Sequence, residues 1–306
     1  MPDIIPFPDQ EKQNYQLAKK AIIEKNYQLA TQLFTKNYVG HRSFKTNKLL
    51  VNALVLAEQF DEALVIADEF YGEYLKRGDQ FAIYINILLK NNKFIQAWKL
   101  VKQQPFATPI VENAENEYRE NAGKQLRQNE RQFSHLGSMD FFGQQQIVQI
   151  GLILPKKEFI EACQIIFIDK DVHPIIKSSL LQEVQSIPNN IDILDYLWID
   201  GTHKKISMKN LVANENEPVV RKINQLTKND DGTVDVQLNK SLNHMLNLKL
   251  GMIYPFAGLF LDVEEEWIEL VKNELGIEST FKTTENLKDM ISLDQLISRE
   301  LTEIMN

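Results

Sequence analysis

Three stretches of the chain repeat nearly the same nine residues, "NYQLATQLF", "QFDEALVIA" and "KFIQAWKLV". In each stretch an aromatic residue precedes an alanine by three positions, and the pairs are Tyr27 with Ala30, Phe60 with Ala63, and Phe94 with Ala97. The alanines lie 33 and 34 residues apart. A fixed period of this length is typical of stacked helical hairpins, because one hairpin cannot bury both of its faces without a copy beside it.

A fourth copy, "EFIEACQII", contains Phe159 and Ala162, and Ala162 lies 65 residues after Ala97, close to two further periods. In each copy, apolar residues recur at helical spacing on both sides of a polar break, which predicts two antiparallel helices. A small residue lets two helix backbones approach closely, so we expect the four alanines to be buried between helices. The alternative is a helical bundle of another kind, in which the four matches arise by chance.

Further positions match the pattern of the tetratricopeptide repeat (TPR). That pattern has a small residue on the first helix, an aromatic residue after the alanine, and a proline where the second helix ends. Ala18 and Phe34 occupy the first two positions around Ala30, and the prolines of the later copies are Pro109 and Pro174. The chain therefore resembles a degenerate TPR array, which implies a right-handed superhelix of helical hairpins. No tryptophan opens any copy, and other residues that depart from the pattern are Val51, Ile85, Ile150, Ala67, Val101 and Ile166.

The sequence pattern changes after residue 187. "ILDYLWIDGTHKKISM" at 193–208 predicts two short strands around Asp200 and Gly201, a dipeptide that favours a type I′ hairpin turn. A second glycine turn at 229–238 closes either another short strand or a loop, and helices are expected at 239–252, 263–275 and 291–304.

We therefore predict a mainly α-helical protein. Its predicted parts are a TPR-like right-handed superhelix of helical hairpins at 11–187 and a small C-terminal module at 188–306 with a β-hairpin and helices. This combination resembles TPR proteins of similar length from Gram-positive bacteria, a resemblance that implies no particular activity.

The overall charge argues against nucleic acid and membrane surfaces as partners. The chain has 34 Lys and Arg against 42 Asp and Glu, a net charge of −8, and no run of five or six basic residues. Both nucleic acid and anionic membranes require a concentrated basic surface. The N-terminus lacks the pattern of a secretory signal, and the apolar runs are too short to cross a bilayer. With a single cysteine, Cys163, the chain forms no disulfide framework, so we expect a cytoplasmic protein.

No arrangement of residues predicts catalysis or metal binding. The five histidines include no pair at ligand spacing on one helix, so a zinc site lacks the ligands it needs. Glu264, Glu265 and Glu266 are consecutive, so their side chains point around a helix and do not converge. We therefore expect no metal, no cofactor and no catalytic residue.

The resemblance to TPR arrays also implies where a partner binds. In such arrays the first helices of successive hairpins line a concave groove that receives an extended peptide or a partner helix. The residues expected on that face are Lys12, Tyr15, Lys19, Lys45, Lys48, Asn52 and Asn86. We therefore expect a non-catalytic scaffold that binds another protein or an extended peptide, and its lysines and amides suit an acidic one.

Two of these residues coincide with a more specific site. Lys48 and Asn52 lie where carboxylate-binding TPR domains keep lysine and asparagine, whereas Asp79 and Ile83 replace the basic or amide groups of the third copy. Two interpretations of these residues stay open: a clamp for a C-terminal carboxylate, and an ordinary solvated lysine face.

The rival hypothesis is an enzyme whose site lies where the C-terminal module meets the repeat groove. Its candidate residues are Asp195, Asp200 and the ring of Trp198. Packing of Trp198 across the strands is the alternative interpretation of that ring.

Overall fold

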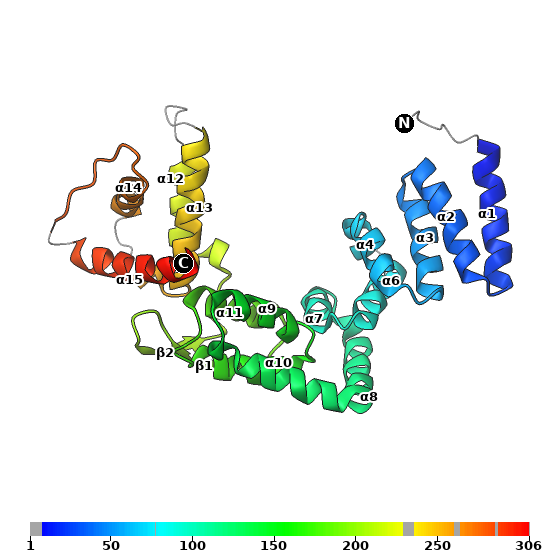
Figure 1. Ribbon diagram of the computed structural model, residues 1–306, viewed down its shortest axis with the longest axis horizontal. Helices are drawn as coiled ribbons and strands as arrows, with labels where there is room; N and C mark the ends of the chain where they lie inside the picture. Colours follow the sequence, from blue (N-terminus) through cyan, green and yellow to red (C-terminus); the bar gives the residue numbers. More distant parts are fainter. Residues whose placement is uncertain (1–7, 77, 229–235, 260–263, 285–286, 306) are drawn as a thin grey trace. The chain divides into compact units, whose positions relative to one another are not determined.

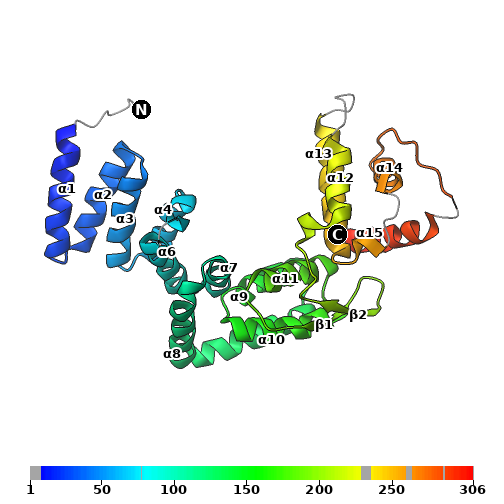
Figure 2. The same cartoon turned by 180° about the vertical axis from the view of Figure 1, so that it is seen from behind.

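The structure is a computed structural model that describes residues 8–76, 78–228, 236–259, 264–284 and 287–305. The chain divides into two compact units, Met1–Glu120 and Asn121–Asn306, and most of their elements are labelled in Figures 1 and 2. Helices dominate the described residues of both units, and a two-stranded sheet is the only β structure found among them. The prediction of a mainly helical protein with a small β-hairpin is therefore confirmed.

The first unit consists of helices that pack on their neighbours in the sequence. Consecutive helices contact one another from α1 to α5, and α6 contacts α4, α5 and α7. Both ribbon views show α1, α2 and α3 side by side (Figures 1 and 2). The helices are α1 (Pro8–Ile23), α2 (Tyr27–Gly40), α3 (Phe44–Leu56), α4 (Phe60–Asp68), α5 (Tyr71–Leu75), α6 (Gly78–Lys90) and α7 (Phe94–Gln103), followed by η1 (Pro105–Ala107) and α8 (Thr108–Ser134).

The hairpins α1–α2, α3–α4 and α6–α7 turn in the same way. Lys25, Glu58 and Asn92, which lie in their turns, have φ angles of 57°, 58° and 53°. In each turn the next amide donates a hydrogen bond to a carbonyl five positions back, as Asn26 N does to Ala21 O at 2.8 Å. This bond belongs to the Schellman motif, in which a residue in the left-handed region ends a helix. The turns recur at the spacing of the alanines, so the first three copies share one local structure.

The fourth copy keeps a buried alanine, but its second helix begins at a different distance from that alanine. Ala162 is buried, as are Ala30, Ala63 and Ala97, which confirms the prediction that all four alanines are buried. Helix α10 (Lys156–Phe167) begins six residues before its alanine, whereas α2, α4 and α7 begin three residues before theirs. The right-handed superhelix implied by the TPR pattern stays a prediction.

The second unit joins the end of α8 to a hairpin and further helices. Phe133 of α8 stacks on Phe159 of α10, with ring centroids 5.7 Å apart. Gly151 makes room for this stack, because a Cβ atom there would lie 2.4 Å from the Phe133 ring. The remaining elements are η2 (Leu136–Ser138), α9 (Phe141–Gly151), α11 (Pro174–Ser186), β1 (Ile193–Leu197), β2 (His203–Ser207), η3 (Asn214–Asn216), α12 (Pro218–Lys228), α13 (Val236–Ile253), η4 (Ala257–Leu259), α14 (Glu264–Glu274) and α15 (Lys288–Met305).

The predicted hairpin at 193–208 is present, but its turn differs from the prediction. Strands β1 and β2 pair antiparallel, with Ile193 opposite Ser207 and Leu197 opposite His203. Gly201 N donates to Trp198 O, and Trp198 N donates to Thr202 O. A type I′ turn needs positive φ at both central residues, but only Gly201 has it here, at +78°. The connection is therefore the longer loop in which a glycine follows a type I turn.

The predicted boundary at 187 lies inside the second unit. Helix α11 ends just before it, yet α11 contacts α13 and α10 contacts β1. Lys177 Nζ of α11 also donates to Leu197 O across the same point, at 3.3 Å. The boundary of a separate repeat domain at residue 187 therefore stays a prediction.

The helices of the C-terminal module were partly predicted. Helices α13, α14 and α15 match the three expected ones within a few residues, and α12 was missed. The glycine turn expected at 229–238 lies mostly outside the described residues, and its last three residues belong to α13. Among the described helices, none has both the length and the apolar character needed to cross a membrane.

Candidate functional site

The residues predicted to bind a partner all lie on first helices of hairpins in the first unit. Lys12, Lys19, Lys45 and Asn86 are exposed, and Tyr15, Lys48 and Asn52 are partly exposed. On α1 and again on α3, the three predicted residues are spaced by three and four positions, which places them on one face of each helix. Asn86 is the only predicted residue on α6. We call these seven residues the first-helix face.

The lysines of the first-helix face have no anionic partner among the residues that the structure describes. Lys12, Lys45 and Lys48 form no ion pair with any described residue. The Lys19 ammonium lies over the Tyr15 ring, 5.0 Å from its centroid, and pairs with no carboxylate of the described chain. By contrast, Lys20 on another side of α1 lies 3.8 Å from Glu24. The face therefore presents four cations whose charge is not compensated within the described residues.

Buried asparagines hold the helices that carry this face. Asn47 of α3 is fully buried. Its Nδ2 donates to Ile66 O at 2.6 Å and to Tyr38 Oη at 3.3 Å, and its Oδ1 accepts from Tyr74 Oη at 2.9 Å. These bonds join α3 to α4, α2 and α5. Sequence reasoning missed Asn47, although its place four residues before Val51 on the apolar stripe of α3 was a usable signal.

A similar pair joins α1 to α2. Asn14 Nδ2 donates to Asn37 Oδ1, and Asn37 Nδ2 donates to Glu11 O, both at 2.9 Å. Because a buried amide must find both donors and acceptors, these bonds fix how the helices are rotated against each other. They therefore orient Lys12 and Tyr15, which directly follow Glu11 and Asn14 on α1.

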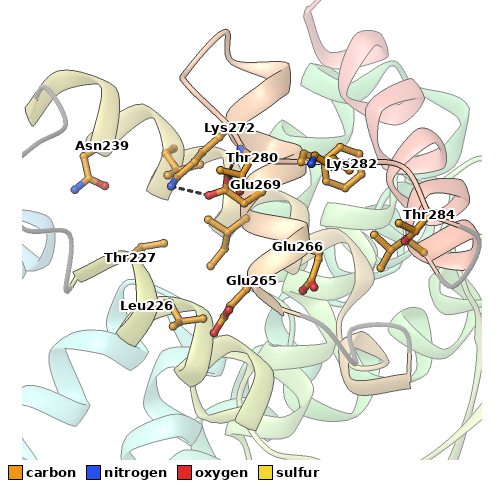
Figure 3. A pocket seen from close by; sticks show the side chains of 14 residues that line it. Leu226, Thr227, Asn239, Glu265, Glu266, Glu269, Lys272, Thr280, Lys282 and Thr284 are labelled. Atoms are coloured by element: carbon orange, nitrogen blue, oxygen red, sulfur yellow. Dashed lines mark hydrogen bonds and ion pairs between the residues drawn. The ribbon is translucent and has the colours of Figure 1, made fainter.

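One cavity of the second unit lies among α12, α13, α14 and the segment that follows α14. It has a volume of about 690 Å³. Figure 3 shows Glu265, Glu266, Glu269 and Lys272 of α14 along one wall, with Leu226 and Thr227 of α12 nearby. The cavity thus combines carboxylates and lysines with apolar side chains.

Two charged groups of this cavity already bind each other and the chain beside them. Lys272 Nζ lies 2.9 Å from Glu269 Oε1 (dashed in Figure 3). Thr280 N donates to Glu269 Oε2 at 2.7 Å. Burial raises the pKa of Glu269, but these hydrogen bonds outweigh it and hold the pKa below its usual value. The pair therefore fastens the segment after α14. Among the described residues, no three His, Cys, Asp or Glu side chains are grouped as a metal site requires.

The residues of the rival enzyme hypothesis have structural partners. Asp195 lies 3.8 Å from Lys205 on the opposite strand, and both side chains are exposed. Asp200 accepts from Thr202 N at 2.9 Å within the hairpin turn. Trp198 is buried, and its Nε1 donates to Ile253 O at 3.1 Å. The Trp198 ring therefore lies inside the unit, bonded to the end of α13.

Two further reactive side chains are also structural. Cys163 is fully buried, and burial raises the pKa of its thiol, which suppresses the reactive thiolate. His173 Nδ1 accepts from Ile175 N at the start of α11, just before Pro174.

Comparison with known proteins shows no family for this chain. No family model, curated protein or solved structure matches it.

Proposed function

We propose that the first unit is a non-catalytic binding surface for another protein, and that it takes an extended acidic segment along its first-helix face. The observation that carries this proposal is the set of four lysines that have no anionic partner among the described residues. A concave groove, as in TPR arrays, and a cytoplasmic setting are part of the proposal. The single buried cysteine supports a reducing compartment.

The chemistry of the face suits an acidic extended chain. Lysines on α1 and α3 supply charge, and the amides of Asn52 and Asn86 can both donate to and accept from a peptide backbone. Because Lys48 and Asn52 are only partly exposed, contacts to them are less screened by water than contacts at a fully exposed rim. A charge pair in such a place can cost about 2–5 kcal/mol when one partner is reversed.

The test measures binding of a labelled acidic peptide to the full chain by fluorescence anisotropy. Lys45→Glu with Lys48→Glu should weaken binding at least about tenfold, and the loss should shrink as salt rises above ~0.15 M. The matched control is Lys36→Glu with Lys90→Glu. It reverses the same charge on two exposed lysines outside the face and should leave binding nearly unchanged.

Two results would contradict the proposal. One is equal binding by the Lys45→Glu, Lys48→Glu variant and the unchanged chain. The other is an equal loss in both double variants, which would show a response to net charge and not to a site. Either result would favour the rival hypothesis, in which the site involves the C-terminal module.

A further inference from the structure

A groove separates helices α2 and α4 of successive hairpins in the first unit. It has a volume of about 420 Å³, and its floor is formed by Leu50 and Leu54 of α3. Two residues along an α-helix correspond to about 200° of rotation. Leu50 therefore points to the opposite side of α3 from Lys48 and Asn52. The α2–α4 groove is thus distinct from the first-helix face.

The walls of the α2–α4 groove are apolar although they face solvent. Val39 of α2 and Val65 of α4 line it with 71% and 66% of their surface exposed. Ile66 adds a partly exposed side chain on the α4 side. Exposed apolar side chains that gather along a hollow are typical of a contact surface, whereas single exposed ones are ordinary.

Carboxylates lie at both ends of this apolar wall on α4. Asp61 and Glu62 occupy its first turn, and Glu69 caps its end. At a rise of 1.5 Å per residue, Asp61 and Glu69 are about 12 Å apart along the helix axis, with Val65 midway. The groove therefore has an apolar centre and acidic ends.

The two acidic ends differ in how far their charge is satisfied. Tyr38 Oη donates to Glu69 Oε2 at 2.6 Å, and Arg42 Nη1 lies 3.6 Å from the same oxygen. At the other end, Glu62 accepts a 3.4 Å hydrogen bond from Gln59 Nε2 and no other from the described part of the chain. Asp61 has no partner among the described residues. The uncompensated negative charge thus lies at the Asp61 end.

We propose that the α2–α4 groove docks a helix of a partner protein whose apolar ridge carries lysine or arginine about one turn beyond its anchor residues. The apolar anchors lie between Val39 and Val65, and the basic residue reaches Asp61 and Glu62. A helix fits better than an extended chain, because it satisfies its own backbone hydrogen bonds while an apolar wall offers an extended backbone none.

This site is independent of the proposed acidic-peptide surface and has the opposite charge preference. A chain that lost one site would keep the other. The two proposals can therefore fail separately in one set of binding measurements.

The probe is a labelled peptide of about 16 residues, long enough to form a helix, with a ridge of leucines and a lysine one turn away. Two matched peptides replace the leucines by serine or the lysine by glutamate. Anisotropy with the full chain at ~0.15 M salt should show the leucine–lysine peptide binding at least about tenfold more tightly than either.

Two variants locate the binding. Val39→Gln with Val65→Gln should abolish the difference in affinity between the leucine–lysine peptide and the serine peptide. Asp61→Asn with Glu62→Gln should abolish the difference in affinity between the leucine–lysine peptide and the glutamate peptide. All four side chains are exposed, so the fold should persist, as circular dichroism would check. One matched control is Ile23→Gln, because the Ile23 side chain is 82% exposed and lies outside the groove. The other is Glu112→Gln with Glu117→Gln on α8.

Three outcomes would overturn the proposal. The first is equal binding of the three peptides. The second is unchanged binding of the leucine–lysine peptide to the Val39→Gln, Val65→Gln variant. The third is a loss of its binding in the Lys45→Glu, Lys48→Glu variant as large as in the groove variants, which would place the peptide on the first-helix face.

Discussion

At the scale of single residues, buried polar side chains fix the relative positions of helices in the first unit. Asn47 is bonded to groups on α2, α4 and α5, so one amide joins three helices to α3. Apolar packing alone leaves helices free to slide or rotate by small amounts, whereas a buried amide has few acceptable geometries. The placement of Lys45 and Lys48 on α3 therefore depends partly on a residue that is itself fully buried.

Replacing Asn47 by alanine should destabilise the first unit strongly. The change leaves Ile66 O and Tyr74 Oη without the amide, and each buried group without a partner costs about 1–3 kcal/mol. We expect a loss of at least about 2 kcal/mol in the free energy of unfolding, measured by urea denaturation. Asn52→Ala, on the same helix but partly exposed, is the control and should change stability by less than about 0.5 kcal/mol. If Asn47→Ala lowered the free energy of unfolding no more than Asn52→Ala does, water would have replaced the amide.

The repeated alanines act at the scale of helix pairs. Ala63 is fully buried in α4, which contacts α3, α5 and α6. A longer side chain has no room at this position, because helix backbones approach one another most closely at such a small residue. Val65, only two positions away on the same helix, is 66% exposed. The same substitution at the two positions therefore separates packing from helix propensity.

Ala63→Leu should destabilise the first unit by roughly 1–3 kcal/mol through overpacking. Val65→Leu should change stability by less than about 0.5 kcal/mol, because leucine is a good helix former at an exposed position. Thermal melts followed by circular dichroism compare the two. Equal melting temperatures for Ala63→Leu and the unchanged chain would mean that the contact at this copy is loose.

Three helices of the second unit meet at a charged cluster. Lys249 of α13 is buried, and its Nζ lies 2.6 Å from both Glu274 of α14 and Asp294 of α15. Trp267 Nε1 donates to Asp294 Oδ1 at 3.0 Å. Two carboxylates thus share one ammonium, so full ionisation leaves an excess negative charge. Burial and the neighbouring Asp294 raise the pKa of Glu274 to about 7.

Glu274→Gln should reduce the pH dependence of stability between pH 5 and 8. A raised pKa in the folded state means that the folded chain binds the proton more tightly than the unfolded chain does. The stabilisation from Glu274 is therefore fully present below its unfolded pKa and is lost as pH rises through about 7. Glutamine keeps an acceptor for Lys249 without the charge, so the variant should gain melting temperature at pH 8 and little at pH 5. Glu278→Gln, an exposed position nearby, is the control. The same gain at both pH values would exclude a titrating Glu274.

The elements show what the sequence could and could not predict. Period and apolar spacing located the helices of the repeats and three helices of the C-terminal module, because burial of one helix face leaves a strong local pattern. Helix α12 was missed, although Pro218 and the apolar Val219, Val220 and Ile223 gave a signal for its start. The hairpin turn was misassigned because a glycine after aspartate fits more than one loop type.

Surfaces could be predicted only in part. The first-helix face followed from the repeat pattern, since its residues recur at the repeat spacing on α1, α3 and α6. The α2–α4 groove combines side chains from three helices, so no local pattern marks it. Val39 and Val65 are ordinary residues in the sequence, and only their placement over Leu50 and Leu54 makes a groove. The place of Asn47 on the apolar stripe of α3 indicated burial, but its bonding partners could not be predicted, because they lie on other helices.

At the scale of the whole molecule, helix α8 serves both units. Before residue 120, Glu115 Oε1 accepts from Trp98 Nε1 at 2.7 Å, and Tyr118 packs on Phe94 with ring centroids 5.2 Å apart. Beyond it, Phe133 packs on Phe159 of the second unit. Between these contacts, Ala122 departs from helical geometry with φ −117° and ψ 19°. Each half of α8 is therefore anchored in its own unit, and the helix is interrupted where the units divide.

A fragment of residues 1–120 should consequently fold alone, whereas a fragment of residues 1–187 should not form a compact second part. The shorter fragment keeps the contacts of Trp98 and Phe94 with α8 and all three hairpins with the common turn. The longer one keeps α10 and α11 but loses β1 and α13, which pack on them, so it exposes apolar side chains such as Phe167 and Leu181 that are buried in the full chain. We expect a cooperative thermal transition for residues 1–120, and for residues 1–187 the same transition together with binding of a hydrophobic dye. A folded, dye-free fragment of residues 1–187 would instead support the boundary that the sequence predicts, with the repeats ending at 187.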